Sequence, residues 1–307
     1  MSTDTDDAPF AESEETPFTD IDLGWEHRKN RIFLGIIFAA SMFGVVMLAL
    51  LLLDVVTDFY RGQTEFGISL IDFFTRDGSR RQELAGFRGA IVASVMLMIF
   101  TAILAFFVGV GSAIYLEEYA PDNRVTRLIE ANLANLAGVP SIVYGLLALA
   151  AFVNGIGLGP ILLAGAIALA LLVMPIIIVS TQEALRAVPD SMRNGSYATG
   201  ATKWQTIRGV VLPAAMPGIM TGTILALARA IGETAPLIMV GALFTNRIAW
   251  GPFDRFSAMP TQIYNWAAEP EPHFIHLAAT GIAVLLAFLF AMNGIAIYLR
   301  NKYERDL

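Results

Sequence analysis

Long apolar runs recur along this chain, and shorter polar segments separate them. Each run is long enough to cross a hydrocarbon layer of about 30 Å as a helix that rises about 1.5 Å per residue. The runs lack the regular alternation of apolar and polar residues that membrane barrel strands show. The pattern therefore predicts an all-α integral membrane protein, whose six transmembrane helices lie near residues 31–56, 89–116, 131–153, 159–181, 211–244 and 275–299.

The composition supports this class. The chain has 307 residues, of which 56% are hydrophobic and 15% are charged. Soluble domains carry about 25% charged residues, so the composition argues against a soluble helical protein. The chain has no cysteine, which excludes a disulfide framework, a cysteine nucleophile and thiolate metal ligands.

Charge divides the chain into segments. Residues 1–27 hold nine acidic residues and neither Lys nor Arg. A segment this polar cannot bury a core, so we expect a disordered acidic cytoplasmic tail there. We expect the first transmembrane helix and its outer loop at 28–84, a transport domain at 85–300 and a cytoplasmic tail at 301–307.

The basic residues beside the predicted spans set the orientation. With both termini in the cytoplasm, twelve Lys and Arg residues lie inside and seven lie outside. Five of the outer seven crowd the first loop, residues 57–88, which conflicts with the rule unless that loop is long enough to cross regardless of charge. The balance still predicts cytoplasmic N- and C-termini.

The loop before the last predicted span is rich in aromatic residues: Trp250, Phe253, Phe256, Tyr264 and Trp266. Aromatic side chains at this density are typical of a belt at the membrane interface. Contact with an external protein is the alternative interpretation.

Residues 183–213 form an amphipathic insert between two predicted spans. Pro189 and Asp190 are typical of a helix start, and Gly200 of a helix end. A second segment starts at Lys203-Trp204 and leads towards the membrane. Such a projecting pair of helices suits insertion into a groove on a soluble partner, although an ordinary surface loop stays open.

Arg229 and Glu233 are charged residues within the fifth predicted span. They stand four residues apart, which places them on one face of a helix. Charges at membrane depth are costly and usually face a water-filled path. The planar fork of Arg suits a tetrahedral oxyanion. The alternative is a structural pair that locks two helices together. Tyr144 could reach the same path. For Pro140, four residues earlier, a kink in a packed helix is the favoured interpretation.

No nucleotide site is visible in the sequence. The phosphate-loop pattern Gly-x-x-x-x-Gly-Lys-[Ser/Thr] is absent, so the chain cannot itself couple ATP hydrolysis to transport. His273 and His276 lack a clear third ligand, so we expect no metal site. We therefore expect no catalytic residues, no cofactor and no enzyme activity.

The insert resembles the cytoplasmic docking loop of ABC importer permeases. Their pattern is Glu-Ala-Ala, three residues, Gly, nine residues, then Ile-x-Leu-Pro. Gly200 matches the glycine, and Val210, Leu212 and Pro213 match the end. Asn194-Gly195-Ser196 replaces Glu-Ala-Ala, a departure from the family pattern.

Three further stretches are similar to the phosphate-specific permease subunits of the PstA type. They are Ala113-Ile-Tyr-Leu-Glu-Glu-Tyr-Ala-Pro121, Leu136-Ala-Gly-Val-Pro-Ser-Ile-Val-Tyr-Gly145 and Ala228-Arg-Ala-Ile-Gly-Glu-Thr-Ala-Pro236. The resemblance covers residues 85–300. It implies the type-I ABC importer permease fold with a cytoplasmic coupling helix, in the cell membrane of a prokaryote.

The resemblance also implies roles for particular residues. The substrate path would include Arg229, Glu233 and Thr234. The ATPase docking residues would be Gly200, Ala201, Thr202, Lys203 and Trp204. The implied partners are a second permease subunit, a cytoplasmic ABC ATPase dimer, an extracytoplasmic phosphate-binding protein and membrane lipid, with no nucleic acid.

Other functions stay open from the sequence. The same machine could carry another oxyanion, such as sulfate or molybdate. A stand-alone secondary transporter or channel would use Arg229 and Glu233 as an ion relay, but it has no need of a docking helix in residues 183–213. An intramembrane enzyme lacks an obvious constellation of nucleophile and base.

Overall fold

The computed structural model describes residues 23–242, 245 and 247–305. The described secondary structure is helical, with turns and short irregular connections between the helices. The chain divides into two units, Met1–Asp54 and Val55–Leu307. Residues 1–22 of the predicted tail lie outside the described residues.

Five helices of the described chain are long and apolar enough to cross a membrane. They are Arg28–Thr64, Arg88–Tyr119, Leu162–Arg186, Lys203–Ile231 and Pro272–Gly294. Arg124–Leu136 and Ser141–Gly155 form a sixth candidate as a bent pair. The membrane class is confirmed, and the sixth candidate is either a broken span or a re-entrant loop.

The first unit contains most of the long helix α1 (Leu23–Thr64). Its large apolar side chains from Ile32 to Leu53 are exposed. Exposed apolar side chains of this kind are expected to contact membrane lipid or another protein, which shields them from water. The predicted span 31–56 lies inside this helix.

The segment predicted as a span at 131–153 is sharply bent. The chain forms α4 (Arg124–Leu136), turns at residues 137–140, and continues as α5 (Ser141–Ala148) and the π-helical η3 (Leu149–Gly155) at 110° to α4. Pro140 causes the break because it lacks an N–H and disfavours helical backbone at the residue before it.

The predicted span 211–244 is also divided. A continuous helical rod runs through α8 (Lys203–Thr206), the π-helical η4 (Ile207–Val211) and α9 (Leu212–Ile231). The rod ends at Gly232, and α10 (Ala235–Val240) starts after a short break. Pro236 in the first turn of α10 fits a new helix start, since its missing N–H costs nothing there.

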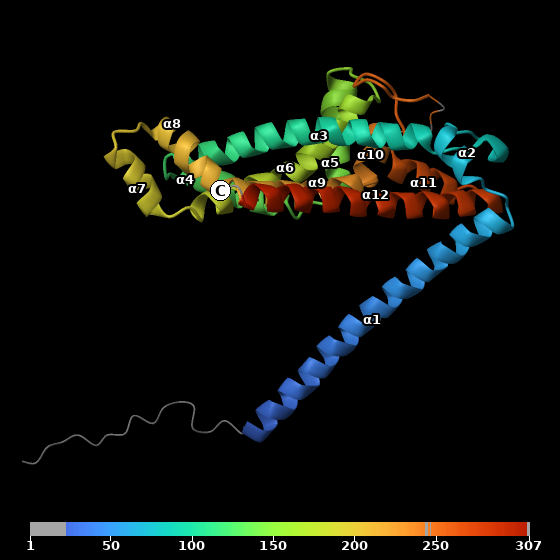
Figure 1. The fold of residues 1–307 in the computed structure, drawn as a ribbon, viewed down its shortest axis with the longest axis horizontal. Helices are drawn as coiled ribbons and strands as arrows, with labels where there is room; N and C mark the ends of the chain where they lie inside the picture. Colours follow the sequence, from blue (N-terminus) through green and yellow to red (C-terminus); the bar gives the residue numbers. More distant parts are fainter. Residues whose placement is uncertain (1–22, 243–244, 246, 306–307) are drawn as a thin grey trace, which may run out of the picture. The chain divides into compact units, whose positions relative to one another are not determined.

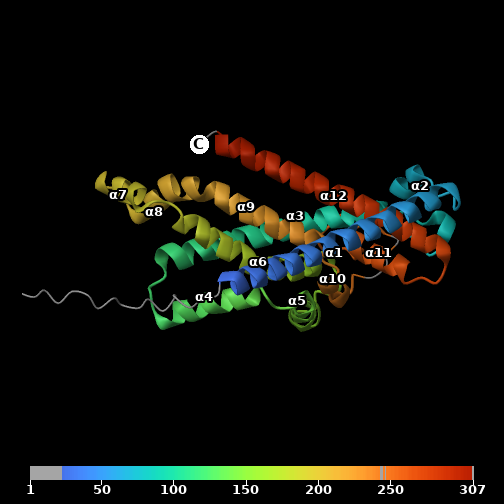
Figure 2. The ribbon, with the colours of Figure 1, turned by 90° about the horizontal axis from the view of Figure 1, so that it is seen from below.

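The core of the second unit is built around α6 (Leu162–Arg186), which packs against both α3 (Arg88–Ile114) and α9 (Figures 1 and 2). Small residues allow close approach of the helices. A Cβ atom on Gly218 would lie 2.7 Å from the Ala184 Cβ, and one on Gly222 would lie 2.4 Å from the Ser180 Cβ. This is the small-residue packing expected between membrane helices, where lipid offers no hydrophobic driving force.

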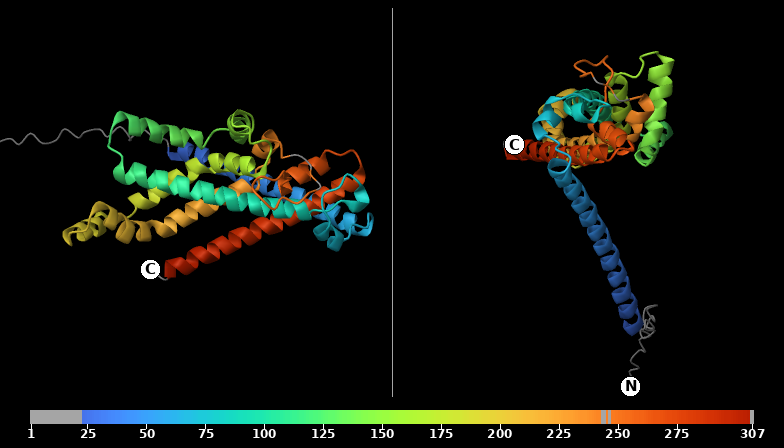
Figure 3. Two further views of the ribbon diagram at one scale, coloured as in Figure 1. Left: turned by 90° about the horizontal axis from the view of Figure 1, so that it is seen from above. Right: turned by 90° about the vertical axis from the view of Figure 1, so that its right-hand side faces the viewer.

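The two ends of α3 carry different structures (Figures 1 and 3). Its first residue lies beside α2 (Leu70–Thr75) and the short η1 (Gln82–Leu84), with α11 (Met259–Ala267) and the start of α12 (Pro272–Arg305). Its last turn continues as the π-helical η2 (Tyr115–Tyr119), near α7 (Asp190–Ala198) and α8. We call these the α2 end and the α7 end.

Two aromatic residues of the loop before α12 are core residues, not members of an interfacial belt. Phe256 and Trp266 are buried, and Trp266 stacks on Phe87 with ring centroids 5.4 Å apart. The expectation of an interfacial belt is wrong for these two because they fill the interior at the α2 end. Trp250, Phe253 and Tyr264 are exposed.

Candidate functional site

The predicted helix pair of the insert is present at the α7 end. Helix α7 begins at Asp190 after Pro189, and its chain reverses at Gly200, where φ is +82°. The Gly200 N–H donates to the Tyr197 carbonyl at 2.9 Å. A positive φ favours glycine because it has no Cβ. The structure thus places Gly200 at the turn that the sequence predicted.

The segment after Gly200 begins the long rod. The Gln205 N–H donates to the Thr202 hydroxyl at 3.4 Å, and the Thr202 N–H donates to the Gln205 side-chain oxygen at 2.8 Å, which closes a capping box. Ala201 lies between Gly200 and this cap, and its N–H donates to the Ser196 carbonyl at 3.4 Å.

Exposed apolar side chains mark the surface of this helix pair. Met192, Tyr197 and Trp204 are exposed, with 57% of Trp204 accessible. Lys203 is held differently, with its Nζ 5.1 Å from the centre of the Tyr119 ring. Apolar groups projecting from a short helical hairpin are suited to packing in a groove of another protein.

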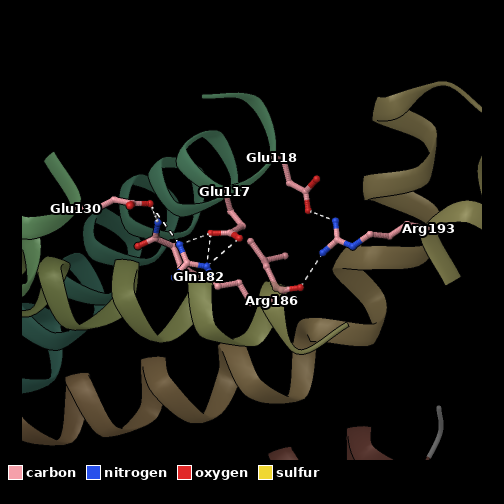
Figure 4. Close-up of polar contacts among 7 residues, drawn as sticks. Glu117, Glu118, Glu130, Gln182, Arg186 and Arg193 are labelled. Carbon is pink, nitrogen blue, oxygen red and sulfur yellow. Dashed lines mark hydrogen bonds and ion pairs between the residues drawn. The ribbon is translucent and has the colours of Figure 1, made fainter. Parts of the chain in front are cut away.

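Helix α7 is fastened to the rest of the unit by Arg193 (Figure 4). Arg193 Nη1 donates to Glu118 Oε1, and Arg193 Nη2 donates to the Leu185 carbonyl at 2.8 Å. The two charged side chains are only 17% and 7% exposed. The pair joins α7 to the last turn of the α3–η2 helix and to the end of α6.

Arg186 forms a second set of contacts beside the first (Figure 4). Its Nε lies 2.9 and 2.8 Å from the two oxygens of Glu117, and its Nη2 lies 3.3 Å from Glu130 Oε1. Gln182 donates to the same Glu130 oxygen at 3.2 Å. The network therefore ties α6 to both η2 and α4.

Sequence reasoning missed the role of these groups. Glu117 and Glu118 were noticed only as part of a family-like stretch, and Arg193 only as a basic residue of the insert. A signal was present in the sequence. Two acidic residues, Glu117 and Glu118, directly follow one apolar run, and two basic residues, Arg186 and Arg193, follow a later apolar run. Which Arg meets which Glu is set by the fold and not by spacing.

The charged pair of the rod lies at its far end from the insert. Arg229 Nε lies 3.4 Å from Glu233 Oε1, across the point where α9 ends. The Arg229 side chain is 45% exposed in this chain alone. Thr234 follows as the N-cap residue of α10, and its side chain makes no capping hydrogen bond.

The two broken segments meet beside this pair. A Cβ on Gly145 of α5 would lie 2.6 Å from the Pro236 Cα of α10, so the two short helices touch backbone to backbone. The Tyr144 hydroxyl donates to the Leu136 carbonyl at 2.8 Å, across the bend before α5. Interrupted helices at membrane depth are tolerated where they are buried in protein or line a watery cavity.

The two histidines near the start of α12 are packed against the end of α1. His276 Nδ1 lies 3.1 Å from the Asp58 carbonyl oxygen, and Phe66 packs against the rings of both His273 and His276. Both histidines thus contribute to the packing between the start of α12 and the residues at the end of α1.

The fold defines a polytopic membrane component with a projecting helix pair, α7 and α8, called the docking hairpin after the role that the sequence predicts for it. Residues 105–305 match the family described as "Binding-protein-dependent transport system inner membrane component". The match covers more than half of the chain, and the chain belongs to this family.

Named relatives cover most of the chain. The probable ABC transporter permease protein YqgI of Bacillus subtilis is 32% identical over 78% of this chain and 87% of the relative. The phosphate transport system permease protein PstA of Mycobacterium leprae is 36% identical over 86% of this chain and 85% of the relative. The predicted resemblance to PstA-type permeases is confirmed.

A solved structure confirms the fold class. A bacterial alginate ABC transporter, in complex with its alginate pentasaccharide-bound periplasmic protein, contains a chain that superposes with a TM-score of 0.65. The alignment covers 91% of this chain and 97% of that chain at 13% identity. At this identity the likeness speaks for the shared importer permease fold alone.

Proposed function

We propose that this chain is the permease subunit of an ABC importer for inorganic phosphate. One observation carries the proposal: the rod Lys203–Ile231 connects the docking hairpin to Arg229, whose partner Glu233 follows just after the rod ends. At about 1.5 Å per residue such a rod is about 43 Å long, enough to connect one face of a membrane to its interior and beyond.

The rod gives the docking hairpin a mechanical connection to the substrate path. An ATPase that grips Trp204 and the residues of α7 moves one end of the rod, because the helix is continuous from Lys203 to Ile231. The other end carries Arg229. Movement of the ATPase therefore changes the position of the guanidinium relative to α5 and α10.

Arg229 supplies the chemistry that a phosphate path needs. Its guanidinium can donate two parallel hydrogen bonds to a tetrahedral oxyanion. Glu233 balances the charge while the path is empty, and arriving phosphate competes with it for the same fork. Thr234 adds a hydroxyl at the break between α9 and α10. The permease does no covalent chemistry in this scheme.

The partners follow from this assignment. A second permease subunit completes the path, since the Arg229 side chain is 45% exposed in this chain alone. Two ATPase subunits lie beneath the α7 end, and a phosphate-binding protein delivers cargo to the α2 end. This orientation places both termini in the cytoplasm and the protein in the cell membrane of a prokaryote.

Reconstitution tests the function. The chain is placed in phosphate-free vesicles alone, with its companion permease and ATPase, and with the binding protein added. We expect ATP-dependent uptake of inorganic phosphate only in the complete assembly. Sustained phosphate uptake by the chain alone would contradict the importer assignment, and uptake of sulfate in place of phosphate would contradict the cargo.

A further inference from the structure

A large basic cleft lies at the α2 end of α3, the opposite end from the helix pair α7 and α8. Its volume is about 1310 Å³. Its charged lining consists of six arginines and two aspartates: Arg76, Arg80, Arg81, Arg88, Arg247, Arg255, Asp77 and Asp254. One wall comes from residues 75–88, and the other from residues 241, 245, 247–248 and 253–256 with Pro160.

Both aspartates of the cleft already have donors. Asp77 accepts from Arg88 Nε at 3.0 Å and from Arg88 Nη2 at 2.9 Å. Asp254 accepts from the backbone N–H groups of Trp250 and Gly251 at 3.0 and 2.9 Å. The acidic groups of the lining are therefore committed to one arginine and to the backbone.

Three arginines of the cleft remain without an acidic partner in the described part of the chain. They are Arg81, Arg247 and Arg255, and all three side chains are exposed. Arg81 belongs to one wall and the other two belong to the opposite wall. Guanidinium groups that face a cleft from two sides create a positive field that attracts anions.

The walls are fixed by backbone hydrogen bonds. On one side, the Phe87 N–H donates to the Phe73 carbonyl at 2.7 Å and the Arg88 N–H to the Arg76 carbonyl at 3.1 Å. On the other side, the Leu162 N–H donates to the Asp254 carbonyl at 2.9 Å. These bonds hold the backbone of the two walls, so less of the cleft has to be ordered when an anion binds.

We infer that this arginine cleft is a binding site for free inorganic phosphate on the outer face of the permease. The inference rests on the proposed function, because the docking hairpin sets which end faces the cytoplasm. It also explains the basic residues that oppose the charge rule in the first outer loop. Four of the five, Arg76, Arg80, Arg81 and Arg88, line the cleft. They are gathered to receive an anion near the mouth of the path.

The test is a phosphate-binding titration of the complete transporter without its binding protein. The complex is held in lipid-free detergent and carries Arg229→Gln, so that the proposed path site does not contribute. We expect saturable binding of inorganic phosphate that weakens as salt screens the cleft. Replacing Arg81, Arg247 and Arg255 together by Gln should raise the dissociation constant on the order of tenfold or more.

Arg61→Gln is the matched control, since Arg61 is exposed on the same outer side but does not line the cleft. It should leave the dissociation constant unchanged. Equal phosphate binding with and without the three cleft arginines would overturn the inference. A second result would also overturn the inference. If the transporter in nanodiscs of anionic lipid holds lipid in the cleft and inorganic phosphate cannot displace it, the cleft is a site for a lipid headgroup.

Two further results separate this inference from the proposed function. Loss of stimulation by the binding protein, with phosphate binding unchanged in the triple variant, would make the cleft a protein contact and overturn the anion site. A complete assembly that binds phosphate in the cleft but imports none would refute the proposed function and leave the cleft site standing.

Discussion

Arg193 of α7 and Glu118 of η2 form an ion pair that is almost wholly enclosed by protein. Removing one partner strands a buried charge, which typically costs about 3–5 kcal/mol. Arg193→Gln should therefore lower the thermal stability of the assembled transporter and reduce the phosphate imported per ATP hydrolysed. The measurements are a melting curve of the complex and the ratio of uptake to hydrolysis in vesicles.

A second ion pair on the same side provides the control. Arg127 and Asp122 are 70% and 82% exposed, and exposed pairs contribute about 0–1 kcal/mol. Arg127→Gln should change neither readout. The double change Arg193→Gln and Glu118→Gln should regain stability, because no charge is left unpaired. If the coupling ratio is normal in Arg193→Gln, the pair does not fix the docking helix.

The turn at Gly200 gives a second prediction. Gly200→Asp forces a residue with a Cβ into a backbone with φ +82° and adds a charge to the docking surface. We expect the variant to insert into the membrane normally but to bind the ATPase at least tenfold more weakly, since strain of about 1–2 kcal/mol acts at the docking turn. The measurement is ATPase retention during purification through a tag on the permease.

Gly195 is the control for that experiment. It lies in the middle of α7, and a Cβ there would meet nothing within 4 Å. Gly195→Ala should keep the ATPase bound and favour the helix by about 0.5–1 kcal/mol. Normal ATPase binding by Gly200→Asp would show that this turn is not part of the docking element.

The contact between α6 and α9 gives a third prediction. A Cβ on Gly222 would lie 2.4 Å from the Ser180 Cβ, so even Ala forces the two helices apart. Overpacking of this kind costs about 1–3 kcal/mol. Gly222→Ala should lower the melting temperature of the purified complex, whereas Gly111→Ala on α3, with nothing within 4 Å, should not. Equal melting temperatures would mean that the two helices are not packed this closely.

Local features of the docking hairpin could be predicted from the sequence. Pro189 opens α7, Gly200 ends it, and Thr202 with Gln205 caps the rod, because each of these signals acts within a few residues along the chain. The same holds for Arg229 and Glu233, whose spacing of four residues places them within reach of each other on one helix.

Features that depend on distant residues could not be predicted. Arg193 meets Glu118 from 75 positions away, and the arginines of the outer cleft converge from two loops. Pro140 could be recognised in the sequence, but whether it kinks the helix or ends it depends on tertiary packing. Proline inside a membrane segment can kink a helix or end it, and here the contact between Gly145 and Pro236 accompanies a bend of 110°.

Arg229 provides the last and most direct test of the substrate path. Its Nε lies 3.4 Å from Glu233 Oε1, and 45% of the Arg229 side chain is exposed. Arg229→Gln should abolish phosphate uptake while the complex still assembles, because the anion loses its bidentate donor. Arg229→Lys should retain part of the uptake, since a point charge replaces a planar fork.

If the pair has only a structural role, the expected result differs. The double variant Arg229→Gln with Glu233→Gln distinguishes the structural role from the anion-binding role. If Arg229 only packs against Glu233, Arg229→Gln lowers the amount of folded complex, and adding Glu233→Gln restores both folding and transport. If Arg229 binds the anion, the double variant assembles but stays inactive. Uptake per assembled complex is the quantity to compare, and restored transport in the double variant would remove Arg229 from the path.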